Sequence, residues 1–163
     1  MAAGPTYTPI QTQTLGSAAS TVTFSSIPQT YTDLVIIFVA KNTGSLNNGK
    51  LIFNSDTGSN YSGTYLQGNG SSAGSGRVTN TSALYTEEIS TTDWTLTTVN
   101  VMNYSNTTTY KTTLIRGGTA SDRTAAWVCL WRNTNAITNI DILTFGGNFA
   151  TGSTFTLYGI SSA

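Results

Sequence analysis

Apolar and small polar residues alternate with a period of two along most of the chain. Successive side chains of a strand point to opposite faces of a sheet, so this alternation predicts β-strands. Good helix formers are scarce, whereas Thr, Val, Ile, Tyr and Phe are abundant. The pattern predicts an all-β protein, an antiparallel β-sandwich of jelly-roll-like type, with a closed barrel as the alternative. About ten short strands are expected, at residues 21–25, 31–40, 50–54, 61–66, 82–89, 94–104, 110–116, 125–132, 137–145 and 153–160.

One of these segments is apolar on both of its faces. Between Tyr31 and Ala40, apolar residues occupy the even positions from Leu34 and also the odd positions from Val35. That pattern is typical of a strand that is covered on both sides, so we expect a central strand here. Residues 67–76 are rich in Gly and Ser and predict a flexible loop, and residues 47–49 (Asn-Asn-Gly) predict a turn.

The N-terminal segment differs from the rest of the chain. Residues 1–14 contain Pro5 and Pro9, which fix the backbone φ angle and disfavour a helix. We interpret residues 1–14 either as an extended arm that reaches a neighbouring subunit or as an ordinary edge strand. Residues 15–163 are expected to form a single β-sandwich domain.

Composition excludes several classes of function. Seven Lys and Arg balance seven Asp and Glu, charged residues make up 9% of the chain, and histidine is absent. A catalytic triad with histidine and a histidine-based zinc site are therefore excluded, and the charge balance predicts no nucleic-acid partner. The single cysteine allows no internal disulfide. The longest apolar run, Leu34 to Ala40, is too short for a membrane helix, and the first residues lack the regions of a secretory signal.

Two segments carry side chains that suit catalysis or metal binding. Glu87 and Glu88 are adjacent carboxylates, but neighbours on a strand point to opposite faces, so they cannot act together on one glycosidic bond. Residues 54–60 place oxygen ligands at alternate positions, as in a calcium loop, but the required Glu is missing and Tyr65 stands in its place. We favour a solvated strand end and a turn. No catalytic residue, metal or cofactor is expected, and the chain is not expected to be an enzyme.

Tryptophans and arginines offer further candidates. Trp127 and Trp131 share one face of a predicted strand and, with Trp94, suggest a platform for sugar rings; the alternative, which we favour, is that Trp127 and Trp131 belong to the core. Cys129 lies between those two and is expected to be a small buried residue. Four scattered arginines either pair with carboxylates across a subunit interface or occupy solvated strand ends: Arg77, Arg116, Arg123 and Arg132.

Several segments, spread over nearly the whole chain, together resemble small β-rich virion proteins of tailed phages, especially cyanophages and other marine bacteriophages. These segments are residues 7–10, 14–20, 24–34, 53–54, 60–62, 102–106, 110–112, 147–149, 152–155 and 157–160. Such modules resemble head decoration (cement) proteins in some settings and fibre domains in others. The chain lacks the coiled coil or long shaft of a fibre, which favours a decoration role.

The resemblance implies a non-enzymatic virion protein that binds and stabilises the head shell, or alternatively a tail fibre or tail-tip adhesin that binds host-surface glycans. The implied partners are the major capsid protein and further copies of the chain, with a trimer favoured, and no membrane. The implied location is the virion, on the head surface, after synthesis in the host bacterial cytoplasm. Tyr7, Pro9 and Ile10 are the expected contacts with the shell or a neighbouring subunit.

Overall fold

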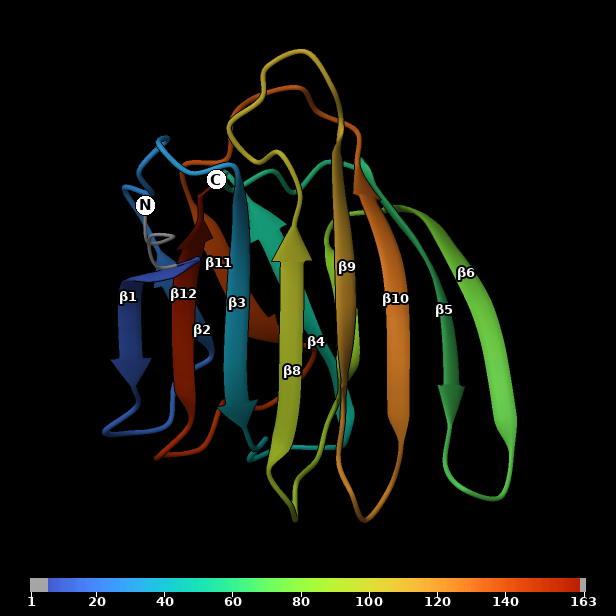
Figure 1. Cartoon of the computed structure of the whole chain (residues 1–163). Helices are drawn as coiled ribbons and strands as arrows, with labels where there is room; N and C mark the ends of the chain where they lie inside the picture. The colour runs from blue at the N-terminus through green and yellow to red at the C-terminus, as the bar shows by residue number, and fades with distance from the viewer. Residues whose placement is uncertain (1–5, 162–163) are drawn as a thin grey trace.

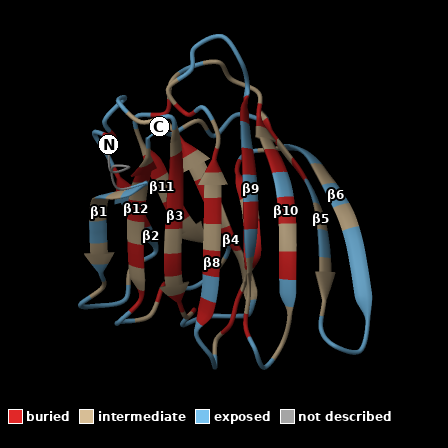
Figure 2. Cartoon of the chain, in the orientation of Figure 1, coloured by how far each residue is buried: buried red, intermediate tan, exposed pale blue. Residues whose placement is uncertain are grey.

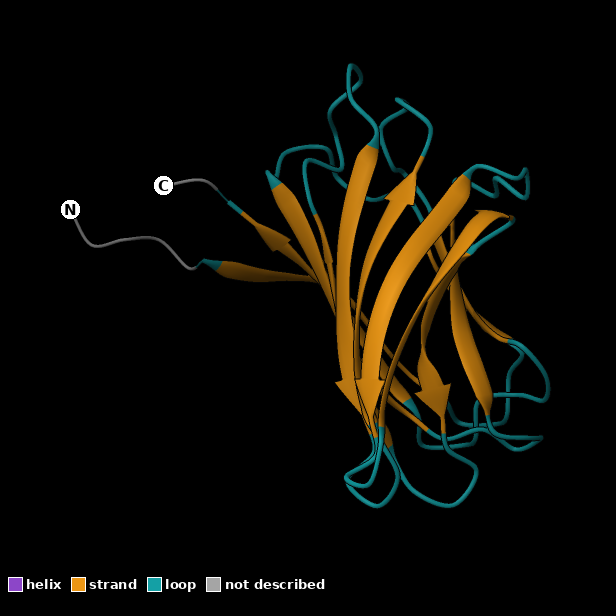
Figure 3. Cartoon of the chain, turned by 90° about the vertical axis from the view of Figure 1, so that its right-hand side faces the viewer, coloured by secondary structure: helices purple, strands orange, loops and turns teal. Residues whose placement is uncertain are grey.

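The computed structural model describes residues 6–161, which form twelve strands and no helix (Figures 1 and 3). Within these residues no helix is long and apolar enough to cross a membrane. The strands are β1 (Tyr7–Thr14), β2 (Thr21–Phe24), β3 (Asp33–Ala40), β4 (Asn47–Phe53), β5 (Tyr61–Gly68), β6 (Ala73–Thr81), β7 (Leu84–Ile89), β8 (Thr95–Val101), β9 (Lys111–Gly118), β10 (Thr124–Trp131), β11 (Ile140–Thr144) and β12 (Thr154–Ile160).

The strands form two antiparallel sheets of unequal size. The larger sheet has eight strands in the order β1-β12-β3-β8-β9-β10-β5-β6, and the smaller has four in the order β2-β11-β4-β7. In Figure 1 the eight-stranded sheet lies in front of the four-stranded one. The predicted all-β antiparallel sandwich is confirmed. Both sheets end in edge strands, so the barrel alternative is excluded.

One strand of the larger sheet, β6, was not predicted. β6 lies where the Gly- and Ser-rich composition predicted a loop, and only residues 69–72 turn the chain between β5 and β6. In that turn Asn69 Oδ1 accepts hydrogen bonds from the backbone N–H groups of Ser71 and Ser72, at 3.1 and 2.8 Å. The loop prediction was wrong because pairing with β5 outweighs the low strand propensity of glycine.

The predicted turn at residues 47–49 was wrong for a related reason. These residues belong to β4, which pairs with β11 and β7. A Cβ atom on Gly49 would lie 2.5 Å from Thr86 Oγ1, so the glycine serves close packing between β4 and β7 and turns no chain.

The N-terminal segment is an edge strand for the part that the structure describes. β1 pairs with β12 of the same chain, with a bulge between Pro9 and Gln11. Gln11 and Gln13 donate side-chain hydrogen bonds to the carbonyl oxygens of Ser25 and Thr23, which ties β1 to the end of the smaller sheet. Residues 7–14 therefore take the second of the two forms expected for them, and residues 1–5 lie outside the described part of the chain.

The strand that is apolar on both faces is covered on one face only. Leu34, Ile36 and Phe38 of β3 point toward the smaller sheet and are fully buried. Val35, Ile37 and Val39 point the other way, where the two sheets formed by residues 6–161 provide no covering sheet; Val35 is nevertheless buried, and Ile37 and Val39 are half-buried. The expectation of cover on both sides was wrong because the whole smaller sheet packs on one face of the larger one (Figure 1).

The half-buried carboxylate of Asp56 contacts the aromatic end of the core. Trp131 lies 5.6 Å from the Phe53 ring and 6.2 Å from the Tyr61 ring, and its indole Nε1 donates a 2.7 Å hydrogen bond to Asp56 Oδ2. Burial alone would raise the pKa of Asp56, but the hydrogen bonds from Trp131, Asn60 and Gly58 lower it. The loop considered above for calcium is thus a turn whose carboxylate accepts N–H donors.

Replacing Trp131 tests this arrangement. Trp131→Phe keeps an aromatic ring but removes the donor to Asp56, so we expect the free energy of unfolding to fall by about 1.5–3 kcal/mol. Trp94→Phe, at a half-exposed position, is the control and should change it by less than about 0.5 kcal/mol. Urea unfolding at neutral pH measures both, and equal stability of the two variants would contradict the assigned role of the indole N–H.

Candidate functional site

The candidate functional site is the face of the eight-stranded sheet that points away from the four-stranded sheet, called here the outer face. Strand alternation builds it: in β9 the exposed Leu114 and Arg116 flank the fully buried Ile115. Figure 2 shows the resulting bands of buried and exposed residues along β9 and β10. Register aligns the exposed positions across strands, so that Leu114 lies opposite Val128, and Arg116 opposite Ala126.

Large aliphatic side chains are exposed at the centre of the outer face. The exposed fractions are 64% for Leu66, 50% for Leu96, 38% for Leu114 and 56% for Val128. These residues come from the neighbouring strands β5, β8, β9 and β10, so they gather on one surface. A gathered set of exposed aliphatic groups is typical of a surface that binds another molecule.

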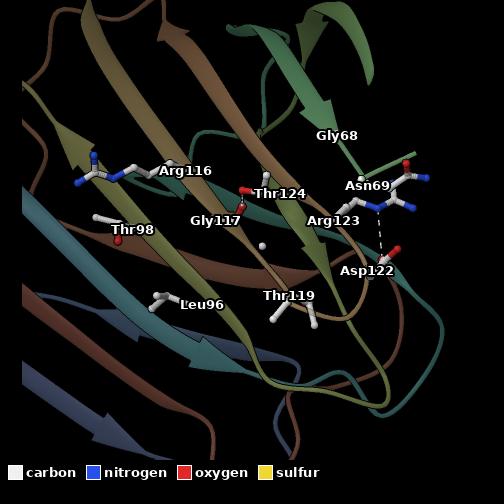
Figure 4. Close-up of a pocket in the computed structure, with 13 residues that line it drawn as sticks. Gly68, Asn69, Leu96, Thr98, Arg116, Gly117, Thr119, Asp122, Arg123 and Thr124 are labelled. Carbon is white, nitrogen blue, oxygen red and sulfur yellow. Dashed lines mark hydrogen bonds and ion pairs between the residues drawn. The ribbon is translucent and has the colours of Figure 1, made fainter. Parts of the chain in front are cut away.

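A hollow of about 580 Å³ opens where β8 and β9 meet the β9–β10 and β5–β6 hairpins. It exists because Gly118 and Gly68 stand in register across the sheet with Thr124 between them. A Cβ atom on Gly118 would lie 2.3 Å from the carbonyl oxygen of Arg123, so glycine is required there. Figure 4 shows Arg116 on one side of this hollow and Arg123 on the other.

A second hollow, of about 660 Å³, lies over β5, β6 and β10. Arg77 and Arg132 line it, together with aliphatic and hydroxyl side chains. The Arg132 guanidinium bonds to uncharged acceptors: it donates hydrogen bonds to Asn80 Oδ1 at 2.9 Å and to the carbonyl oxygen of Ser59 at 2.7 Å. Each hollow therefore presents guanidinium groups beside apolar surface.

The three N-terminal contact candidates divide between the outer face and the interior. Tyr7 and Pro9 are exposed at the β1 edge of the sheet, and the Tyr7 ring meets the outward-pointing Tyr158 edge-on at 6.0 Å. Ile10 is partly buried against the core. Tyr7 and Pro9 can therefore extend a contact made by the outer face, whereas Ile10 contributes to folding.

The three tryptophans do not come together. Trp127 and Trp131 are buried, in agreement with the core interpretation, and Trp127 packs on Tyr65 with ring centroids 4.3 Å apart. Cys129 is buried between them, and burial raises the pKa of its thiol to about 12. A sugar platform of Trp127 and Trp131 is incompatible with their burial. Trp94 alone is accessible, at 47% exposed, with Lys41 Nζ 5.4 Å from its ring centre.

The adjacent carboxylates of β7 point to different environments, as strand geometry predicts. Glu88 pairs with Arg123 at 3.0 Å, whereas Glu87 is buried where β7 packs against β8, β9 and β10. Within residues 6–161, Glu87 Oε2 has no hydrogen-bond partner. Burial raises the pKa of Glu87 to about 7, and the positive charge of Arg123 opposes this rise. The pair therefore forms no two-carboxylate site.

Comparison with known proteins identifies no family. No family model matches the chain, and no curated protein matches its sequence. Among solved structures, the chain is similar to the exo-inulinase of Aspergillus awamori, with a TM-score of 0.49 and 11% sequence identity. The match covers 94% of this chain and 29% of the exo-inulinase chain.

The buried carboxyl group of Glu87 predicts a pH-dependent stability. Between pH 4.5 and about 7 the folded protein retains a proton that the unfolded chain has released, so the free energy of unfolding should fall as the pH rises through this window. We expect a fall of about 2–3 kcal/mol in urea titrations from pH 5 to pH 8. Glu87→Gln should abolish it, and the control Glu88→Gln should keep it. An unchanged fall in Glu87→Gln would show that another group causes it.

Proposed function

We propose that the chain is a non-enzymatic structural protein of a tailed-phage virion: a decoration protein that binds and stabilises the head shell. The observation that carries the proposal is the outer face, an open sheet surface with exposed Leu66, Leu96, Leu114 and Val128. The resemblance of many chain segments to small β-rich phage virion proteins supports the same role. The partners in this proposal are the major capsid protein and further copies of the chain, with a trimer favoured.

The outer face suits a protein that functions by being packed against another. Burial of the accessible half of each of its four exposed aliphatic side chains contributes about 1 kcal/mol to the free energy of binding. The remaining positions are largely Thr, Ser and small residues, whose hydroxyl groups can form hydrogen bonds across an interface. In a trimer three such faces are linked, so the modest free energy of binding of each copy adds up to tighter binding of the whole assembly.

The positions of the carboxylates support a role without catalysis. Asp56 accepts a hydrogen bond from Trp131 at the edge of the core, Glu87 is buried, and Glu88 is paired with Arg123. A glycosidase needs two carboxyl groups that face one substrate across a groove. Among the described residues that line the two hollows of the outer face, Asp122 supplies a single carboxylate, and it pairs with Arg123.

One observation favours the second candidate function, a tail fibre or tail-tip adhesin that binds host-surface glycans. Trp94 is half-exposed, and the backbone of Gly152 lies beside the edge of its ring. An exposed indole of this kind can stack on a sugar ring. This candidate now depends on Trp94 alone, since the other two tryptophans are buried.

The location of the chain in purified particles tests the proposal. After heads and tails are separated, we expect quantitative mass spectrometry to find the chain with the heads, at a copy number comparable to that of the major capsid protein. Particles without it should lose their genome at a lower temperature, because the shell lacks the added contacts. Recovery of the chain only with tails or fibres would contradict the decoration role.

Glycan binding tests the second candidate. If the chain is an adhesin, Trp94→Ala should reduce binding to host polysaccharide at least tenfold, since stacking of a ring on one aromatic side chain contributes about 1–3 kcal/mol. Tyr110→Ala, at another exposed aromatic, is the matched control. A wild-type protein that binds no host glycan, or a Trp94→Ala variant that binds as well as wild type, removes this candidate.

A further inference from the structure

We infer that the outer face docks on a protein surface that presents carboxylate groups among apolar side chains, with Arg116 as the central polar contact. The inference rests on the proposed function, because it names the surface that meets the shell and the chemistry that the shell must offer. It is carried by three features of the described residues: the segregation of charge, the open position of Arg116 and the apolar pattern of β3.

Charge is balanced over the whole chain but not over its surfaces. Four of the seven cationic residues line the hollows of the outer face, Arg77, Arg116, Arg123 and Arg132, against one carboxylate, Asp122. The carboxylates have other partners or are buried. Glu87 is buried, and the half-buried Asp56 accepts a hydrogen bond from Trp131. Glu88 and Asp122 pair with Arg123, whereas Asp93, Asp141 and Asp33 accept hydrogen bonds from Ser121, Thr23 and the N–H of Asn103. The outer face therefore carries a net positive charge, and a negatively charged partner complements it.

Arg116 is exposed on the outer face, where its guanidinium can contact a partner. It lies in register between Thr98 of β8 and Ala126 of β10, whose short side chains leave the guanidinium uncovered. Both ion pairs found in residues 6–161 involve Arg123, and neither involves Arg116. A guanidinium beside a hollow and next to Leu96 can bind a carboxylate through two parallel hydrogen bonds while aliphatic groups around it exclude water.

The sequence of β3 also indicates that a partner covers the outer face. Val35, Ile37 and Val39 face outward from a strand with the composition of one that is buried on both faces; Val35 is already buried, whereas Ile37 and Val39 are only half-buried. Their register continues the apolar surface toward the exposed residues of β8, because Val39 lies opposite Leu96. A partner that covers the centre of the outer face would bury Ile37 and Val39 fully as well.

The side chains select a protein partner over a sugar or a second copy. The exposed large apolar residues of β5, β8, β9 and β10 are aliphatic, whereas sugar rings stack on aromatic rings. Two copies joined through their outer faces would bring the arginines of both faces together, and like charges oppose such a contact. An apolar protein surface with carboxylates satisfies both the aliphatic and the guanidinium groups.

Co-sedimentation with phage particles that lack the chain tests the inference. The purified wild-type chain is added to these particles together with Arg116→Glu, Val128→Thr and the control Lys50→Glu. Lys50 lies on the smaller sheet, so its substitution makes the same change in net charge on the opposite side of the molecule. We expect at least tenfold weaker binding for Arg116→Glu, a several-fold loss for Val128→Thr, wild-type binding for Lys50→Glu, and weaker wild-type binding as salt rises. Unchanged thermal unfolding would verify that the variants are folded.

The outcomes separate the inference from the proposed function. If the wild-type chain does not bind the particles, the decoration role fails. If it binds and Arg116→Glu binds equally well, or if Lys50→Glu is as weak as Arg116→Glu, the role stands and the outer face is the wrong surface. Alginate serves as a probe for the other class of acidic partner. Arg116-dependent binding to alginate without binding to particles would overturn a protein partner.

Discussion

The architecture depends on one constraint: a four-stranded sheet packs on an eight-stranded one, and it can cover only one of that sheet's faces. Because side chains alternate along a strand, every core residue of β3, β8, β9 and β10 has neighbours that point the other way. The inward residues include Ile36, Ile115 and Trp131, all fully buried. No second sheet covers the outward residues, and the apolar side chains among them make the outer face the distinctive surface of the molecule.

The core is completed by polar groups whose surroundings differ. Asp56 is surrounded by donors, and its hydrogen bond from Trp131 connects the turn after β4 to the end of β10. Glu87 receives one hydrogen bond, from the N–H of Glu88, and burial keeps its carboxyl group readily protonated. Asp56 serves its own turn and the core tryptophan, and Glu87 is buried, so the hollows of the outer face hold four arginines and one carboxylate, Asp122. A sparse, evenly balanced charge composition thus becomes an asymmetric surface once the chain is folded.

Much of this fold could be predicted from the sequence because two-residue alternation is a local signal. The ten expected segments correspond to ten of the strands, and the core position of Trp127 and Trp131 follows from their shared parity. β6 could not be predicted, since its Gly- and Ser-rich sequence becomes a strand only through pairing with β5. The outer face escaped prediction for a similar reason. Arg77, Arg116 and Arg132 are far apart in sequence, and only the strand register places them on one surface. The apolar outward residues of β3 were a signal of cover, but the sequence cannot say whether that cover belongs to the same chain.

The most direct test of a docking role for the outer face is an electron-microscopic map of the assembled particle in which side chains are resolved. The map should place the eight-stranded sheet against the shell, with Leu114, Val128 and Arg116 buried in the contact and a carboxylate of the capsid protein beside the guanidinium. A map that shows the chain bound to the shell through the four-stranded sheet, with the outer face toward solvent, would contradict it.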